Sequence, residues 1–329
     1  NASLLDEGTA AGEAMMMFYN QKNKRNKGEE IQNEFFVDQH VYEQNKQVVL
    51  TRAEPLGIKV IVGDWKTFKP SDKTFGVLLQ FPNAQGAVVD YKMLVTLCQK
   101  NKIYITVAAD LLSLALIKPP GEWGADAVVG NTQRFGVPMG FGGPHAAFFS
   151  TKEDFKRLIP GRIIGVSIDA DDNPTLRMAL QTREQHIRRE KATSNICTAQ
   201  ALLAIMASMY GVYHGAAGLT RIARRTQLLT TILADGLREL GHTIENDTIF
   251  DTITVAVDDA QAIAASADEH RVNLRINDDG TVGIALDETV TAADLQTIWA
   301  IFGATAPLNV DVLADSARLD YGDMARESE

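Results

Sequence analysis

Short apolar runs alternate with amphipathic stretches along the first half of the chain. Continuous apolar runs separated by helical spacing are typical of buried parallel strands and their crossover helices, so the pattern predicts an α/β fold with a parallel sheet covered on both faces. The predicted strands are 35–37, 58–62, 77–81 and 103–108, with helices from about residue 41 and over 91–99.

Two further apolar stretches have helical spacing. Residues 4–19 predict a helix with Ser3 as its N-cap and with Asp6 and Glu7 in the first turn, where carboxylates suit the helix dipole. Residues 201–213 are the most apolar helical run, bounded by Gln200 and His214. Because that run is too short to span a bilayer, we expect a buried core helix and no membrane segment.

The pattern changes around residues 215–218. A long helix is predicted over 219–240, followed by short strands and helices at 252–257, 260–268, 272–276, 282–285 and 292–302. We therefore expect a large α/β domain over 1–218 and a small α+β domain over 219–329. The polar tail, 315–329, resembles an internal segment that has been truncated.

Composition excludes several classes of function. The 329 residues carry 42 acidic against 32 basic side chains, a formal charge of −10 that argues against binding nucleic acid by neutralising phosphates. Two distant cysteines, Cys98 and Cys197, indicate neither a disulfide scaffold nor a zinc site, and a reducing compartment is expected. No secretory signal opens the chain. The histidines show no metal-ligand spacing, so we predict no metal; they are His40, His145, His186, His214, His242 and His270.

Residues 126–150 contain the most distinctive loop of the chain. Two apolar strands, 127–129 and 146–149, flank a polar corner at 131–134 and a connection punctuated by prolines. Its glycines are Gly136, Gly140, Gly142 and Gly143. Such a loop either binds a ligand or is a tight turn, and His145, which follows it, is either structural or catalytic. The glycine spacing matches neither a dinucleotide fingerprint nor a phosphate-binding P-loop.

Three stretches in order resemble the glycine cleavage system P-protein family: residues 1–10, residues 119–150 and residues 182–200. The resemblance is to the N-terminal half of this pyridoxal-phosphate-dependent glycine dehydrogenase (decarboxylating). It implies the PLP-dependent transferase-like fold (aspartate aminotransferase, fold type I), with a smaller α+β C-terminal domain. Because the chain starts within a family motif, we expect a fragment that lacks an upstream segment.

Asp110 follows the strand at 103–108 and has two readings. In enzymes of this fold class the equivalent aspartate pairs with the pyridine nitrogen of the cofactor; alternatively, Asp110 caps the next helix. The Schiff-base lysine that should follow is absent, since no lysine lies between Lys118 and Lys152. Gln133, or with one residue of slippage Arg134, stands in its place, and neither side chain can act as the amine nucleophile.

The resemblance therefore implies no catalytic residue in this chain and at most a vestigial cofactor site. Its residues would be Asp110, Thr132, Gln133, Gly140, Gly142, Gly143 and His145. At the helix N-terminus that receives the cofactor phosphate in this superfamily, Asp6 and Glu7 would repel it. Pyridoxal phosphate (PLP) is expected in the other half of the protein.

The family resemblance also implies the partners. They are a lysine-bearing half or subunit, the lipoylated H-protein and glycine, in a dimer or heterotetramer, with no nucleic acid and no membrane. The expected location is the bacterial cytoplasm or the mitochondrial matrix. Two alternatives stay open: a non-catalytic assembly or regulatory module on the same fold, and a nucleotide-binding α/β protein using the glycine loop.

A basic stretch, 183–191, also has two readings. Arg183, His186, Arg188, Arg189 and Lys191 could bind phosphate, but Glu184 and Glu190 interleave with them. Mixed charge of this kind favours a helix surface or a subunit contact, and we expect pairing through residues 183–197 and the glycine loop.

Overall fold

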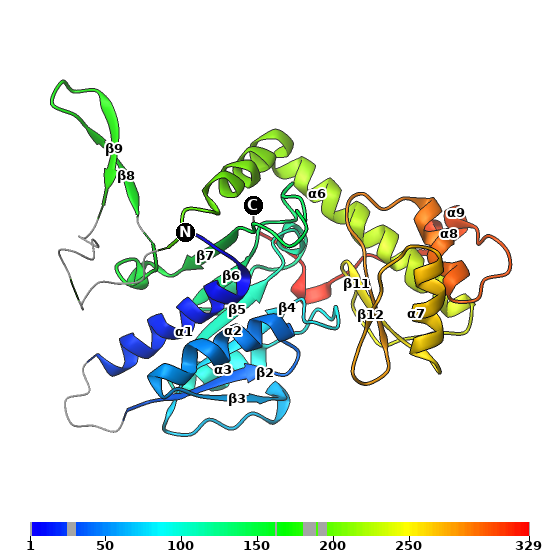
Figure 1. Cartoon of the computed structure of the whole chain (residues 1–329), viewed down its shortest axis with the longest axis horizontal. Coiled ribbons are helices and arrows are strands. Elements are labelled where there is room, and N and C mark those ends of the chain that lie inside the picture. The colour runs from blue at the N-terminus through cyan, green and yellow to red at the C-terminus, as the bar shows by residue number, and fades with distance from the viewer. Residues whose placement is uncertain (1, 25–30, 162, 180–188, 190–195, 329) are drawn as a thin grey trace. The chain divides into compact units, whose positions relative to one another are not determined.

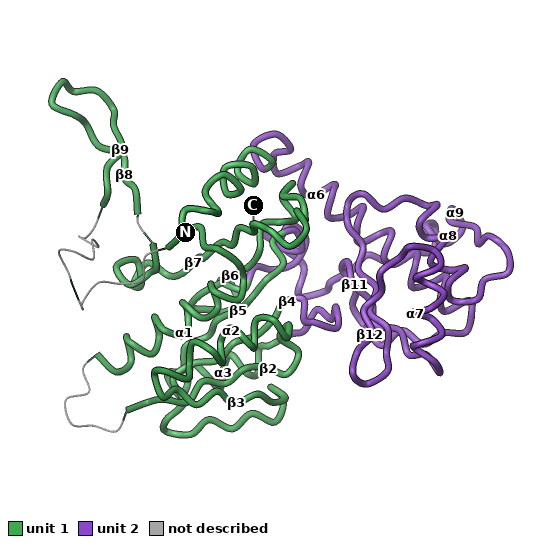
Figure 2. Tube along the Cα trace, viewed as in Figure 1, with its two compact units in different colours: residues 1–80, 91–111, 120–210 green, residues 81–90, 112–119, 211–329 purple. Residues whose placement is uncertain are grey.

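The computed structural model describes residues 2–24, 31–161, 163–179, 189 and 196–328. Contacts divide the chain into two compact units (Figures 1 and 2). Unit 1 comprises residues 1–80, 91–111 and 120–210; unit 2 comprises 81–90, 112–119 and 211–329. The long helix that links them changes unit at residues 210/211, whereas the sequence places a domain boundary at 218/219.

Unit 1 is built on a seven-stranded sheet with the order β1-β7-β6-β5-β4-β2-β3. Strand β2 pairs in parallel with β3 and β4, and β5 pairs in parallel with β6. Strand β7 pairs antiparallel with both β6 and β1, so the sheet is mixed where the sequence predicts a parallel one. The strands are β1 (Ala2–Leu4), β2 (Glu34–Asp38), β3 (Lys59–Gly63), β4 (Thr74–Phe81), β5 (Tyr104–Ala109), β6 (Ala127–Asn131) and β7 (Ala147–Thr151).

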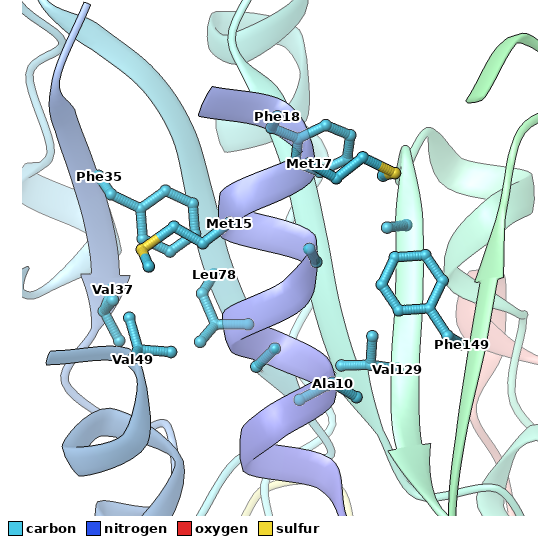
Figure 3. Close-up of a cluster of buried hydrophobic side chains, with 14 of the residues drawn as sticks. Ala10, Met15, Met17, Phe18, Phe35, Val37, Val49, Leu78, Val129 and Phe149 are labelled. Atoms are coloured by element: carbon cyan, nitrogen blue, oxygen red, sulfur yellow. The ribbon is translucent and has the colours of Figure 1, made fainter. Parts of the chain in front are cut away.

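Helix α1 (Glu7–Asn23) covers one face of this sheet (Figure 3). In the figure it lies between the strands that carry Phe35 and Val37 and those that carry Val129 and Phe149. Small residues on α1 let it approach closely, since a Cβ added at Gly8 would lie 3.1 Å from the Val48 side chain of α2 (Glu43–Ala53). The helices α3 (Lys92–Lys100) and α4 (Pro120–Trp123) complete the unit.

The predicted start of the first helix is wrong. Ser3 lies in β1, opposite Phe148, and Asp6 is the N-cap. Asp6 accepts a hydrogen bond from the Thr9 amide at 2.7 Å, and the Thr9 hydroxyl accepts one from the Asp6 amide at 3.2 Å. Because this reciprocal capping box satisfies two backbone donors, the helix begins at Glu7.

A hairpin of β8 (Ile164–Ile168) and β9 (Pro174–Met178) follows the main sheet in sequence. A single 3₁₀ turn, Glu153–Phe155, follows β7, and the hairpin starts a few residues later. Figure 1 shows the hairpin at one end of unit 1, away from the seven strands.

Unit 2 contains a four-stranded antiparallel sheet in the order β10-β11-β13-β12. Its strands are β10 (Thr243–Ile244), β11 (Thr252–Ala256), β12 (Arg275–Ile276) and β13 (Val282–Ala285), and its helices are α7 (Ala260–Glu269), α8 (Ala292–Ile301) and α9 (Val310–Ser316). Trp299 is fully buried in this core, and its Nε1 donates to the Leu233 carbonyl at 3.1 Å. The C-terminal part of the long helix supplies Leu233 and Leu237 to the same core.

The long helix, α6 (Ala201–Glu239), corrects the expectation of a short buried helix at 201–213. It runs on past a non-helical residue, Gly215, and the apolar side chains Leu202, Ile205 and Met209 are 59–65% exposed. Among the described residues α6 alone is long and apolar enough to cross a membrane, with a mean hydropathy of 1.3 over an 18-residue window of which 17% is buried. The first turns of α6 therefore carry exposed apolar side chains on one face.

Candidate functional site

Polar side chains gather where β4 and β5 end and α1 begins. Glu7 is the first residue of α1, Gln80 lies near the end of β4, and Asp110 directly follows β5. Asn45 of α2 donates hydrogen bonds to Glu7 Oε1 and, at 3.3 Å, to Gln80 Oε1, while Gln80 Nε2 donates to Glu7 Oε1 at 3.4 Å. Carboxyl ends of parallel strands form the ligand crevice of α/β sheets, so this network lies where a site is expected.

Glu7 is the titrating member of this network. Burial raises its pKa from the ordinary 4.5 to about 7, the hydrogen bonds from Asn45 and Gln80 lower it, and the nearby carboxylates of Asp110 and Asp6 raise it further. Desolvation is the largest of these effects and disfavours the ionised carboxylate. Near neutral pH the network therefore holds a proton on Glu7 in a substantial fraction of molecules.

The corner after β6 is held by local hydrogen bonds. The Asn131 side chain accepts from the Gln133 amide at 2.7 Å, a turn typical of asparagine. The Thr132 amide and hydroxyl both donate to the Ala146 carbonyl, at 2.8 and 2.9 Å. Thr132 is buried and fixes the corner to the start of β7, so its hydroxyl is engaged with the protein's own backbone.

Arg134, the last residue of the corner, turns toward Asp110. Its Nη1 lies 3.9 Å from Asp110 Oδ2, and both side chains are mostly buried. An arginine remains protonated at any physiological pH, so it supplies a permanent positive charge beside this carboxylate. The structure thus brings together two of the residues that the sequence singles out, Asp110 and Arg134.

The glycines of the loop form its tight turn. Gly136, Gly140, Gly142 and Gly143 all have positive φ, and the Gly142 and Gly143 amides donate to the Met139 carbonyl at 3.2 and 3.3 Å. The start of the loop packs on α6, since a Cβ at Gly136 would lie 2.7 Å from the Tyr210 ring. These contacts are local, so a ligand-binding role for Gly140, Gly142 and Gly143 stays a prediction.

His145, at the end of the loop, has its Nδ1 buried and without a hydrogen bond from any described residue. A cofactor-binding role for His145 also stays a prediction. Within the described part of the chain, no group of three or more His, Cys, Asp or Glu side chains could hold a metal ion.

The sequence interpretation missed three residues of this edge. Asn45 and Gln80 bind Glu7, and Asp38, the last residue of β2, is fully buried with its pKa raised by desolvation. A polar residue at or next to the end of an apolar strand was the available indication for Asp38 and Gln80. Asn45 carries no such indication, because polar residues surround it in the sequence and its burial appears only in the fold. Of the basic stretch, Arg183, His186, Arg188 and Lys191 lie outside the described residues.

Glu7 makes the stability of the chain depend on pH. Between pH 4.5 and 7 the folded chain keeps a proton on Glu7 that the unfolded chain has lost, so the free energy of unfolding falls as pH rises through this window. Glu7→Gln keeps the hydrogen-bond acceptor and removes the titration. We expect the variant to match the wild type near pH 4 and to exceed its stability above pH 7 by roughly 3 kcal/mol.

The measurement is urea unfolding of both proteins from pH 4 to pH 8. The matched control is Glu122→Gln, which makes the same substitution at an exposed position of α4. A constant difference between Glu7→Gln and wild type at all pH values would contradict this account of Glu7.

The family comparison decides the identity of the chain. The family model for the glycine cleavage system P-protein matches residues 1–302. The chain belongs to the glycine cleavage system P-protein family. A glycine dehydrogenase (decarboxylating) of Synechocystis sp. is 52% identical over 100% of this chain and 33% of its own length. A relative from Nostoc sp. with the same name is 53% identical over 94% of this chain and 31% of its own length.

Solved structures agree with this assignment. An inhibitor-bound glycine decarboxylase (P-protein) of the glycine cleavage system superposes with a TM-score of 0.82 at 28% identity, covering 96% of this chain and 71% of that one. A C-DES variant with glycine covalently linked to its PLP cofactor shares the fold alone, with a TM-score of 0.61 at 16% identity over 95% of this chain and 80% of that one. The α/β fold of type I PLP enzymes is confirmed. This P-protein chain spans about a third of the length of its curated relatives.

The described residues at this edge of the sheet do not fit PLP. The corner offers no primary amine, because Asn131, Thr132, Gln133 and Arg134 occupy it. Asp110, which would pair with the pyridine nitrogen, faces the guanidinium of Arg134 at 3.9 Å instead. At the N-terminus of α1 the Asp6 carboxylate already accepts from the Thr9 amide, so an acidic side chain stands where a phosphate would bind.

Proposed function

We propose that the chain is the half of a glycine dehydrogenase (decarboxylating) that lacks the Schiff-base lysine, and that it packs against the lysine-bearing half and helps to wall its active site. The observation that carries the proposal is the family match over residues 1–302 together with the Asp110–Arg134 pair in place of a cofactor site. In the intact protein, glycine would lose its carboxylate as carbon dioxide, and the aminomethyl group would pass to the lipoyl arm of the H-protein.

PLP bound in the other half would supply the electron sink for decarboxylation. The described residues of this chain have a supporting role in the proposal. The Glu7, Asn45 and Gln80 network and the Asp110–Arg134 pair place protein groups at the carboxyl ends of the strands, where enzymes of this fold bind a ligand. In the proposal these bonded groups give the other half a fixed surface to pack on.

Helix α6 supports the existence of a large partner. Its inner face packs Leu203 and Ala207 against Val137 and Ala146 in a small core, whereas Leu202, Ile205 and Met209 point outward and are exposed. A helix that is apolar all round is typically buried on every side. The first turns of α6 therefore fit an interface with the lysine-bearing half.

Release of labelled carbon dioxide tests the proposed function. The full-length protein would be incubated with carboxyl-labelled glycine and lipoylated H-protein, with unlipoylated H-protein as control. Release that depends on the lipoyl group supports the proposal. Absence of release from a correctly folded, PLP-loaded protein would favour the alternative, an assembly or regulatory module on this fold. Saturable nucleotide binding to residues 1–329 would instead favour the nucleotide-binding alternative.

Residues 1–329 alone are expected to form no specific covalent adduct with PLP. Without an amine at the corner, only scattered surface lysines can react, each weakly. The chain would be treated with near-stoichiometric PLP, trapped with borohydride and mapped by mass spectrometry, with the lysine-bearing half as the positive control. One dominant adduct, for instance on Lys118, would show that this half has a cofactor site of its own.

A further inference from the structure

The hairpin of β8 and β9 has one apolar face. Its strands pair antiparallel with Ile164 opposite Met178, Val166 opposite Leu176 and Ile168 opposite Pro174. Directly opposed residues in an antiparallel pair point to the same side, and so do every second residues along a strand. These three pairs, which we call the hairpin face, therefore form one continuous surface without a charge.

The other side of the hairpin is polar. It carries Gly165 opposite Arg177 and Ser167 opposite Thr175. On the hairpin face, by contrast, the exposed fractions of the large side chains run from 44% for Met178 to 82% for Val166. The apolar side of this ribbon thus faces solvent in the described chain.

A hairpin with this arrangement requires a covering surface. An isolated two-stranded ribbon is marginally stable in water, and a contiguous exposed apolar patch typically marks an interaction site. The turn is well ordered by local bonds, since the Asp169 side chain accepts from the Asp171 and Asn173 amides, each at 2.9 Å. The ribbon is therefore formed by its turn and its ladder, and the hairpin face remains to be covered.

The composition of the face indicates the kind of partner. Surfaces that meet and separate repeatedly are as polar as the rest of a protein, whereas permanent interfaces are more apolar. The hairpin face lacks any charged side chain, so it fits a permanent contact and not the repeated visits of a lipoyl carrier protein. The chain covers only 33% of the Synechocystis relative, so most of the polypeptide in such a protein lies outside these residues.

We propose that the hairpin face docks permanently onto the part of the P-protein polypeptide that lies outside residues 1–329, so that β8 and β9 form an arm clamped on the lysine-bearing half. This inference rests on the proposed function for the identity of the partner. The polar side of the hairpin, with Arg177 and Ser167, remains on the outside of the assembly.

Thiol reactivity in the full-length protein tests the docking. Val166→Cys places a thiol on the hairpin face and Ser167→Cys, its neighbour, places one on the polar side. In the described chain Val166 is the more exposed of the two positions. Docking reverses this order: we expect the Val166→Cys thiol to react with a maleimide at least about tenfold more slowly than the Ser167→Cys thiol, as expected for a buried site.

Peptide mapping by mass spectrometry separates these thiols from the natural cysteines. Equal rates, or faster labelling at Val166→Cys, would overturn the docking. If both variants still release carbon dioxide from glycine, such a result leaves the proposed function standing. Slow labelling in a protein that never releases carbon dioxide would support the docking and count against the function.

A photo-crosslinking amino acid at Val166 identifies the occupant. We expect crosslinked peptides from outside residues 1–329, with a yield that does not change on dilution because the contact is permanent. Crosslinks to residues 1–329 of a second copy, or to H-protein, would overturn the assignment. The same amino acid at Ser167 serves as control and should give little product.

Discussion

Replacing Gly130 with alanine is expected to destabilise unit 1 by about 3 kcal/mol or more, toward the upper end of overpacking effects. Gly130 lies in β6, opposite Phe148, and a Cβ there would stand 2.2 Å from the Ala109 carbonyl oxygen and 2.5 Å from the Phe148 ring. The carbonyl is backbone and has no rotamer to change. Strands β5 and β6 would have to separate next to Asp110, so the Asp110–Arg134 pair would also be disturbed.

Thermal unfolding measures this effect. A loss of about 3 kcal/mol in a unit of this size lowers Tm by roughly 6–12 °C. The matched control is Gly121→Ala in α4, where an added Cβ meets nothing within 4 Å and which should change stability by less than about 0.5 kcal/mol. If the two variants had the same Tm, the packing described around Gly130 would be wrong.

Ile205→Glu is expected to weaken association with the lysine-bearing half by about 100-fold, the size of a hot-spot substitution. Ile205 is exposed on the outer face of α6, so the change should leave the fold of the chain intact. In the proposed complex a carboxylate would be buried there without a partner, which is strongly unfavourable. The two halves would be expressed as separate chains and their association followed by sedimentation velocity.

Ser208→Glu provides the control for Ile205→Glu. Ser208 is exposed on the same turns of α6, so the variant adds the same charge away from the centre of the apolar face. It should weaken association by less than about threefold, as for a rim position. Equal weakening by both variants would point to long-range charge repulsion, and no weakening by either would remove α6 from the interface.

Strands of the seven-stranded and four-stranded sheets could be predicted where they are continuous apolar runs. Strand β4, whose residues are all buried, is the clearest case, and β13 has the predicted bounds. Strand β1 was not predicted, because Leu4 also fits the spacing of the helix that follows it. Only the pairing of Leu4 with Ala147 distinguishes a strand from a helix at this position. The exposure of α6 could not be predicted, since an exposed apolar helix and a buried one can have the same composition.

The places of Asp110 and Arg134 were predictable from local sequence, because one follows a strand and the other ends the polar corner. Their roles toward a cofactor stay a prediction. The contacts of Glu7 were not predictable, because Asn45 is 38 residues away along the chain and Gln80 is 73. Burial shifts the pKa of Glu7, and burial is a property of the assembled fold.

Unit 2 takes two of its pieces from within the sequence of unit 1, residues 81–90 and 112–119. Asn246 donates to the Gln85 carbonyl at 2.8 Å, Arg326 Nη1 donates to the Leu114 carbonyl at 2.6 Å, and Lys118 donates its amide to the Met324 carbonyl at 2.8 Å. During synthesis these two segments are made before the residues that they bind, which follow more than a hundred residues later in the chain. The two units therefore cannot mature one after the other on the ribosome, and residues 211–329 made alone would lack two of the segments against which they fold.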